Sequence, residues 1–420
     1  MKLKTLILLS VILIGTVQVC FVTNWQASTT LVGPISYLLM VFIYIIYRQI
    51  DDKTDFENRR VMTFYLILGI IAIFRGFFEA KNYWDWKFLF FDSALVMLVP
   101  LIGFVGSDKK ITQVIYYNYF KYLIPISFYV YFAAKHSDNT DGYTRFLSPL
   151  YVIIIFFPVL TKKIKIIIGI LVLMSFFSDL GSRSNLIRII AAGGLMTLYY
   201  FQEPIQKKVL KVMHIAFFAL PILFFLLAST DIFNVFKIGE DYGDQYVVEK
   251  KLENGQLEED DMTTDTRTFL YQEVLNSGIK RGTWLFGESA SAGYQSDFFW
   301  EISLATKGRQ RSEVSILNVF NVFGLIGVIA FTLVYFYASY LCIYVSNSVI
   351  CKLLGLFIAF RWTFAWIEEF FDFSINFFFL WLIIGLCFSK AFRAMNDDEF
   401  KNWVLGMFDK KHIEDETLVY

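Results

Sequence analysis

Two arginines stand where the chain is expected to begin a helix. Arg183 lies within Gly-Ser-Arg-Ser-Asn at 181–185, before a run of small and apolar residues, and Arg267 lies near the start of an amphipathic stretch at 265–277. A helix N-terminus has free backbone N–H groups and a partial positive charge, which favour a phosphate and disfavour a cation. Both arginines are therefore candidates for binding an anion. The alternative interpretation is that Arg183 only contacts a lipid headgroup and Arg267 only faces water.

Each of these arginines is followed by ten residues and then a glycine, Gly194 in the first case and Gly278 in the second. Glycine makes up about 7% of an average protein, so a single spacing of this kind is weak and a pair is more informative. Each glycine also has a structural explanation. Gly194 stands among small residues that favour close packing of membrane helices, and Gly278 fits a helix C-cap.

More ionisable residues lie just before the chain returns to apolar sequence. Arg309 and Arg311 add positive charge there and are further candidates for binding an anion. Glu313 follows them at the expected membrane boundary, where a poorly solvated carboxylate is suited to accept a proton as a general base. The alternative for Glu313 is an ordinary acid at a helix start, which the helix dipole favours.

Three accessory candidates lie in or beside apolar runs, where charge is costly and commonly functional. Arg188 follows Arg183 by about one helical turn. Arg361 and Glu368 lie about two turns apart on one helix face. They either form an ion pair or line an entrance for an acceptor substrate, and we expect the pair.

Membrane helices must position all of these residues. The 420-residue chain is 56% hydrophobic and 18% charged, whereas soluble domains carry roughly 25% charged residues. The apolar residues form continuous runs that suit helices rather than a β-barrel, and most runs, at about 17–22 residues, match the thickness of a bilayer. We expect an all-α, polytopic transmembrane bundle of about twelve spans, at 4–22, 31–48, 61–77, 89–106, 111–133, 147–160, 164–180, 184–201, 210–230, 313–345, 349–367 and 373–389. The run 313–345 is too long for one straight span, so it should start at the interface or tilt strongly.

Lys and Arg are concentrated in alternate loops, which the positive-inside rule places in the cytoplasm together with both termini. Residues 1–20 also resemble a signal peptide, but they are long enough to span and we expect them to be retained. The expected organisation is nine spans in 1–230, a large extracytoplasmic loop at 231–312, three spans in 313–389 and a cytoplasmic tail at 390–420. The zero net charge gives no signal for nucleic acid, and the three histidines are too scattered for a histidine metal site.

The two Arg-x10-Gly motifs, each in an outward-facing segment, resemble those of the bacterial O-antigen polymerase family. The end of the large loop is similar to that of the wider polymerase and ligase superfamily, and the similar segments are Leu285-Phe286-Gly287, Ser312-Glu313-Val314-Ser315-Ile316-Leu317-Asn318 and Phe323-Gly324-Leu325-Ile326-Gly327-Val328. The resemblance covers roughly residues 178–330. The first 150 residues match only in hydropathy.

This resemblance implies a GT-C-like glycosyltransferase in the bacterial inner membrane that needs neither a metal nor another cofactor. It would join oligosaccharide repeats carried on undecaprenyl diphosphate into a surface polysaccharide of the O-antigen or capsule type. Arg183 and Arg267, with Arg309 and Arg311, would hold the diphosphates, and Glu313 would be the catalytic base. The partners would be these lipid-linked oligosaccharides, the bilayer, a flippase and a chain-length regulator, with no nucleic acid.

Two other functions are compatible with parts of the sequence. In O-antigen ligases, which transfer glycan to a lipid core, a histidine near the end of the large loop is expected to act as the base. Residues 231–312 contain no histidine, and Glu313 takes roughly its place, which favours the polymerase. A flippase or transporter of lipid-linked glycan should have charges along a central cavity and little extramembrane mass. Sparse mid-span charge and a long loop favour the enzyme instead.

Overall fold

The computed structural model describes most of the chain, namely residues 2–23, 28–50, 53, 55–137, 140–178, 183–201, 207–230, 247–251, 257–261, 267–296 and 308–419. These parts are predominantly helical, with one antiparallel pair of strands, β1 (Val247–Lys251) and β2 (Leu257–Asp261). Each of the twelve expected apolar runs is helical in the described residues. The chain therefore has the character of a helical membrane protein.

Six apolar stretches in the described residues are long enough to cross a bilayer. They correspond to α1 (Leu3–Val22), α2 (Ser28–Arg48), α3 (Arg59–Glu79), the interrupted series α4 (Tyr83–Phe88), η1 (Leu89–Ser93), α5 (Ala94–Leu98) and α6 (Pro100–Gly106), then α13 (Lys207–Ser229) and α16 (Ser315–Val345). Two shorter apolar stretches contain α10 (Leu150–Phe156) and α18 (Ile375–Phe388).

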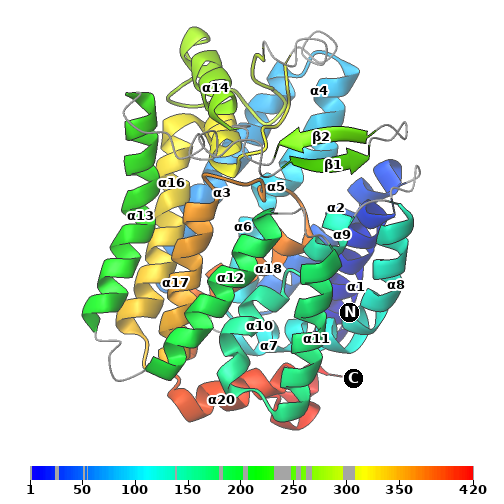
Figure 1. Ribbon diagram of the computed structural model, residues 1–420. Coiled ribbons are helices and arrows are strands. Elements are labelled where there is room, and N and C mark those ends of the chain that lie inside the picture. The colour runs from blue at the N-terminus through cyan, green and yellow to red at the C-terminus, as the bar shows by residue number, and fades with distance from the viewer. Residues whose placement is uncertain are drawn as a thin grey trace.

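The remaining elements fill the bundle and its two ends. They are α7 (Lys109–Asn118), η2 (Tyr119–Leu123), α8 (Ile124–His136), α9 (Thr140–Phe146), η3 (Phe157–Val159), α11 (Lys162–Ser178), α12 (Arg183–Leu198), η4 (Tyr199–Phe201), α14 (Thr268–Lys280), α17 (Val349–Phe364), α19 (Lys390–Ala394), α20 (Asp397–Gly406), η7 (Lys410–His412) and η8 (Glu416–Leu418). In Figure 1, α14 lies at the upper end of the bundle and α20 at the lower end.

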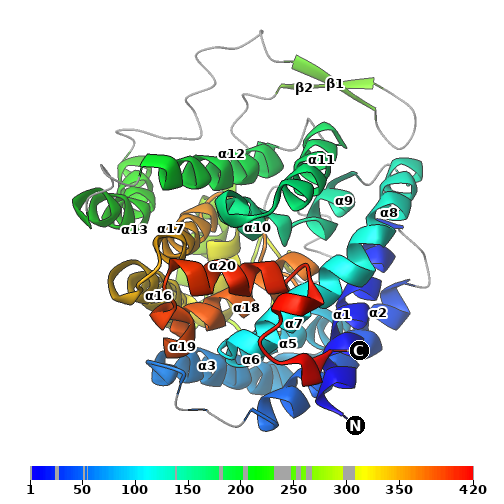
Figure 2. The same ribbon diagram turned by 90° about the horizontal axis from the view of Figure 1, so that it is seen from below.

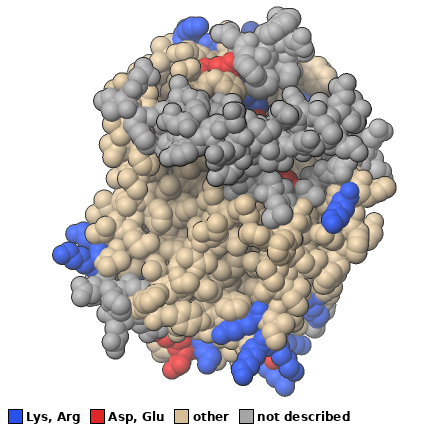
Figure 3. Space-filling model, viewed as in Figure 1, with Lys and Arg blue, Asp and Glu red and all other residues tan. Residues whose placement is uncertain are grey.

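The centre of the bundle is formed around α18, in which every residue is buried. A helix that is apolar on all sides belongs in the interior of a bundle. By contrast, only 17% of the apolar stretch in α13 is buried, so most of its surface is free to contact lipid hydrocarbon. Lys and Arg gather at the lower end of the face shown in Figure 3, below a broad uncharged band.

The long helix α16 is broken at Gly324, where the backbone has φ 66° and ψ −162°. The segment at 283–287 lies against this break. Leu325 N donates to Trp284 O at 2.9 Å, and Ile326 N donates to Leu285 O at 3.2 Å. The run at 313–345 is thus accommodated by a kink within the helix, and two of the similar segments named above are hydrogen-bonded to each other.

The C-terminal residues, expected only as a tail, fold under the lower end of the bundle (Figure 2). The side chain of Asn396 and that of Glu399 form a capping box at the start of α20. Trp403 Nε1 donates to Lys109 O at 3.0 Å, and Lys109 Nζ lies 2.7 Å from Glu414 Oε1. These contacts fix the tail against α7, so it is an ordered part of the fold.

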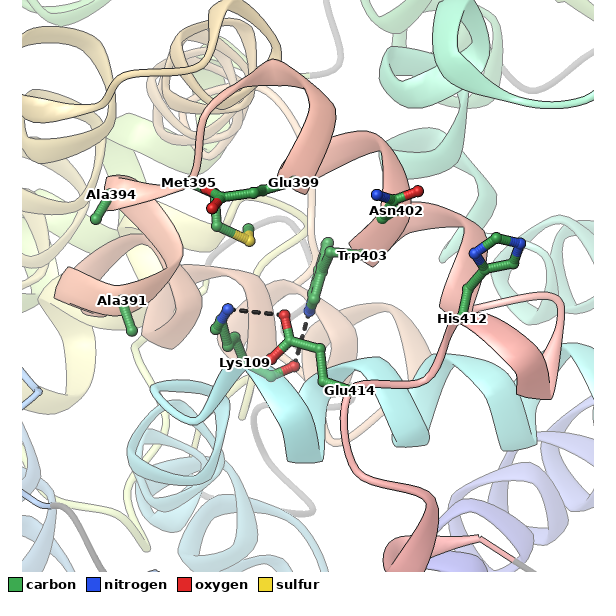
Figure 4. Close-up of a pocket in the computed structure, with 9 residues that line it drawn as sticks. All are labelled: Lys109, Ala391, Ala394, Met395, Glu399, Asn402, Trp403, His412 and Glu414. Carbon is green, nitrogen blue, oxygen red and sulfur yellow. Dashed lines mark hydrogen bonds and ion pairs between the residues drawn. The ribbon is translucent and has the colours of Figure 1, made fainter.

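A cavity of about 470 Å³ lies between this C-terminal unit and α7 (Figure 4). The cavity is lined by both apolar and polar side chains, among them Met395, Asn402 and His412. Lys109, which also lines it, is already paired with Glu414. The cavity is at the end of the bundle opposite α14, so it is remote from the arginines considered below.

Candidate functional site

The connection between α17 and α18, residues 365–374, is the platform of the candidate site. Ser315, the first residue of α16, fixes it at several points. Ser315 N and Oγ both donate to Glu368 O, at 3.1 and 2.8 Å, and Phe370 N donates to Ser315 Oγ at 2.8 Å. A serine at a helix start is suited to such contacts because its hydroxyl can both donate and accept. The connection carries the carboxyl groups of Glu368, Glu369 and Asp372.

Arg267 and Glu313 meet above this platform. Arg267 directly precedes α14, which begins three residues after the start of the expected stretch 265–277, and its Nη1 lies 2.5 Å from Glu313 Oε2. Its Nε donates to Ile367 O at 3.3 Å. Arg309 Nη2 lies 3.2 Å from the other carboxylate oxygen of Glu313. Both carboxylate oxygens of the expected base therefore accept from an arginine, and 53% of the Glu313 side chain is exposed, so the poorly solvated carboxylate expected at this position is not found.

Arg311 points to a different group of acids. Its Nη2 lies 2.7 Å from Asp92 Oδ1 in η1, and its Nη1 lies 3.8 Å from Glu369 Oε1. Nη1 also donates to Phe371 O at 2.8 Å. The side-chain amide of Asn318 donates to the other oxygen of Glu369. Arg311 thus joins the segment before α16 to η1 and to the platform.

Arg188 and Arg361 lie deeper and are almost fully buried, with 4% and 1% of their surface exposed. Arg188 Nε and Nη2 donate to the backbone oxygen and the hydroxyl of Ser184, at 3.0 and 3.2 Å. Arg361 Nη1 and Nη2 have no hydrogen-bond partner in the part of the chain that the structure describes. The expected ion pair between Arg361 and Glu368 is not formed, because no carboxylate oxygen lies within 4.0 Å of Arg361 in the described chain.

Burial raises the pKa of the Glu368 carboxyl group above its usual range. Three arginines act in the opposite direction, in the order Arg188, Arg267 and Arg145. Burial also raises the pKa of Glu369 well above its usual range. The platform therefore holds two acids that bind a proton more readily than exposed carboxylates do.

The structure also bears on the two glycines of the Arg-x10-Gly motifs. A Cβ atom built on Gly194 would meet nothing within 4 Å in the described chain, so the expected close packing of helices at this glycine is wrong. A Cβ atom on Gly278 would lie 3.0 Å from the Phe320 ring, where α14 packs on α16. Gly278 lies inside α14, which ends at Lys280, so the C-cap expected at this glycine is displaced toward Arg281.

The expected site residues thus fall into connected groups at one end of the bundle. Arg267, Arg309 and Glu313 form one group, and Arg311 joins Asp92 and Glu369. Arg188, Arg361 and Glu368 lie below them. Arg183 is the first residue of α12, as expected, but its side chain lies outside the described part of the structure.

Sequence reasoning did not assign roles to three residues at this end. Asp92, the partner of Arg311, could have been singled out from the sequence because it is an acid within an apolar run. Arg145 lies 2.8 Å from Asp141 and 3.2 Å from Asp372. Arg75 donates to the backbone oxygens of 286–288 and thereby fixes the segment against the α16 kink. No pattern in the sequence pointed to the last two contacts.

Comparison with known proteins adds no name to this site. No family model, no curated protein and no solved structure matches the chain. Within the described residues, no group of three or more His, Cys, Asp or Glu side chains is placed to hold a metal ion. What the site offers chemically is a set of guanidinium groups that can bind an anion and carboxyl groups that can take a proton.

Proposed function

We propose that this protein polymerises oligosaccharide repeats carried on undecaprenyl diphosphate into a surface polysaccharide of the O-antigen or capsule type. The observation that carries the proposal is the contact between Arg267, the arginine of the second Arg-x10-Gly motif, and Glu313 at the start of α16. It places a group suited to bind a diphosphate beside a group suited to take a proton. Transfer of a sugar from a diphosphate carrier to a hydroxyl needs both functions.

The contact also suggests an order of events. An incoming diphosphate competes with Glu313 for Arg267, because its oxygens bind the same guanidinium N–H groups. When Arg267 turns to the diphosphate, Glu313 Oε2 becomes free to face an acceptor hydroxyl. Arg309 remains on Oε1 and keeps the carboxylate in place.

In the transfer itself, the acceptor oxygen forms a bond to the anomeric carbon and its proton passes to Glu313. The bond from that carbon to the diphosphate oxygen breaks, and undecaprenyl diphosphate leaves with the electron pair. Arg183 and Arg267 stabilise the charge of the two lipid-linked substrates, with Arg309 and Arg311 nearby. Attack from the face opposite the leaving group inverts the anomeric configuration.

The proposed location is the inner membrane of a bacterium, with the α14 end on the extracytoplasmic side. The support is the concentration of Lys and Arg in the loops at the opposite end, which also holds α19 and α20. A flippase would then deliver the substrate to the site, and a chain-length regulator would act on the product.

A gel of surface glycan tests the proposal. A deletion strain receives the wild-type gene, Arg183→Ala, Arg267→Ala, or the control Arg60→Ala, whose arginine is exposed at the other end of the bundle. We expect the ladder to collapse to a single repeat in Arg183→Ala and in Arg267→Ala, and to persist in the control Arg60→Ala. Polymer that remains on its lipid carrier without reaching the core would instead identify a ligase. A normal ladder in both site variants would refute the roles of the arginines.

A reconstituted assay separates the enzyme from a flippase. Purified protein in vesicles receives labelled lipid-linked repeats on one side. Joining of the labelled repeats into longer chains supports the polymerase. Movement of the lipid between leaflets without extension would establish a transporter.

A further inference from the structure

Two buried arginines inside the bundle have no acidic partner among the residues that the structure describes. Arg361, in the last turns of α17, and Arg188, in the second turn of α12, are both more than nine-tenths buried. The end nitrogens of Arg361 have no hydrogen-bond partner, and neither arginine has a carboxylate oxygen within 4.0 Å in the described chain. A buried charge is costly unless an opposite charge or hydrogen bonds compensate it.

The aromatic rings nearby compensate only a part of this charge. The guanidinium carbon of Arg361 lies 4.3 Å from the centre of the Phe370 ring. That of Arg188 lies 5.3 Å from the centre of the Tyr151 ring. Both arginines also approach the same ring, Phe364, at 5.7 and 6.0 Å. Cation–π contacts are weaker than ion pairs in a dry site, and here two like charges share one ring.

The other arginines at this end of the bundle are different. Each of four has a carboxylate oxygen within 4.0 Å, and these are Arg145, Arg267, Arg309 and Arg311. The lack of an acidic partner is therefore specific to the deeper pair and is not a general property of this end.

The carboxylate that acts on both arginines is that of Glu368, on the platform between α17 and α18. Among the described residues its carboxylate forms no hydrogen bond or ion pair, but it acts electrostatically on Arg361 and Arg188. It is only partly buried, whereas both arginines are fully enclosed. Glu368 therefore compensates the pair from a distance without occupying the guanidinium N–H groups.

We propose that Arg188 and Arg361 form an internal site for a phosphate-type oxyanion, with Glu368 as the partial counter-charge in its absence. Two guanidinium groups offer planar forks of N–H donors that match phosphate oxygens, and their two charges match a doubly charged phosphoryl group better than one carboxylate. The proposal requires the connection at 368–370, whose backbone Ser315 holds, to move so that an anion can reach Arg361. That this oxyanion is the diphosphate of a lipid-linked substrate rests on the proposed function, but the site itself does not.

Thermal unfolding of the purified full-length protein in lipid nanodiscs tests the site. The probes are inorganic pyrophosphate and a short-chain prenyl diphosphate, each titrated against the wild type and Arg361→Met. The matched control is Arg393→Met, because Arg393 is equally buried but is ion-paired with Glu57 at the other end of the bundle. Methionine keeps most of the side-chain volume and removes the charge.

We expect the wild type to gain thermal stability from at least one probe. Arg361→Met should lower the affinity for that probe by about tenfold or more, as expected for loss of charge-assisted hydrogen bonds. Without a probe, Arg361→Met should unfold at the same or a higher temperature than the wild type, because an uncompensated charge is gone. Arg393→Met should lower the unfolding temperature and leave probe affinity unchanged.

Stabilisation by both probes would show that the oxyanion alone suffices, and stabilisation by the prenyl diphosphate alone would show that the lipid is needed. Absence of stabilisation of the wild type by either probe, or full affinity in Arg361→Met, would overturn the site. A second variant, Glu368→Gln, removes the competing negative charge and should raise affinity; lowered affinity would contradict the proposal. A chain that binds the probe but makes no polymer would refute the proposed function and leave the site standing.

Discussion

Arg267 and Glu313 stand 46 positions apart in the chain, yet their side chains form an ion pair with 2.5 Å between Nη1 and Oε2. Arg267 directly precedes α14 and Glu313 lies just before α16, so the pair ties the starts of two helices together. An anion that displaces Glu313 from Arg267 changes the surroundings of that carboxylate. In the proposed function, this one contact links substrate binding to release of the base.

Lysine at position 267 should fail nearly as badly as alanine. Arg267 contacts Glu313 through Nη1 and Ile367 O through Nε at the same time, and a single ammonium group cannot reproduce this fork. We expect Arg267→Lys and Arg267→Ala both to reduce chain extension by about tenfold or more. The measurement is the rate of extension by purified protein with lipid-linked repeats. Chain extension by the lysine variant at the wild-type rate would count against diphosphate binding by this residue.

Replacing Glu313 by glutamine should slow chain extension while the protein still folds. Glutamine keeps the shape of the side chain but cannot take the proton of an acceptor hydroxyl, and general-base catalysis contributes about 10²-fold or more. The matched control is Glu414→Gln, which removes an acid paired with Lys109 at the other end of the bundle. Equal rates for Glu313→Gln and this control would exclude Glu313 as the base.

Binding of the oxyanion should depend on the charge of Glu368. Burial raises the pKa of this carboxyl group, so it becomes neutral at a higher pH than an exposed glutamate. Below that raised pKa the competing negative charge is absent. The affinity of Arg188 and Arg361 for the anion should therefore increase as the pH falls through the pKa of Glu368. The charged groups that act on Glu368 from the neighbouring elements are Arg188, Arg267, Arg145 and Asp141, and Glu368 also interacts with Arg361.

Pyrophosphate and prenyl diphosphate change charge with pH themselves, so the comparison must be made with Glu368→Gln at each pH. The ratio of the wild-type affinity to the variant affinity should approach one at low pH and fall as pH rises. A ratio that is constant over the whole range would mean that Glu368 does not influence the site.

Alanine at Gly324 should destabilise the protein. Gly324 has φ 66°, and a Cβ atom there would lie 2.4 Å from the backbone carbon of Leu285. The cost is about 1–3 kcal/mol from the backbone alone, and the clash adds to it. A lower unfolding temperature of the purified variant is the expected result. The control is Gly193→Ala, where the new Cβ atom would meet nothing within 4 Å in the described chain; an equal effect of both changes would refute the steric explanation.

The helices and the type of protein were determined by the sequence alone. A continuous apolar run must satisfy its backbone hydrogen bonds internally, so hydropathy predicts a helix without knowledge of any neighbour. The helix near Arg267 was likewise predicted from a local amphipathic pattern, although it begins at Thr268 rather than at 265. These features depend on residues that are close together in the chain.

Tertiary structure decided which of the charged residues meet. Hydropathy contains no information on the partner of a side chain, so the pairing of Arg311 with Asp92 could not be derived from it. The expected pair of Arg361 and Glu368 does not form, because Glu368 lies beyond the end of α17, on a connection held by Ser315 rather than on the same helix. The physical reason is the same in both cases: contacts between distant segments are set by how the helices pack and where each one ends.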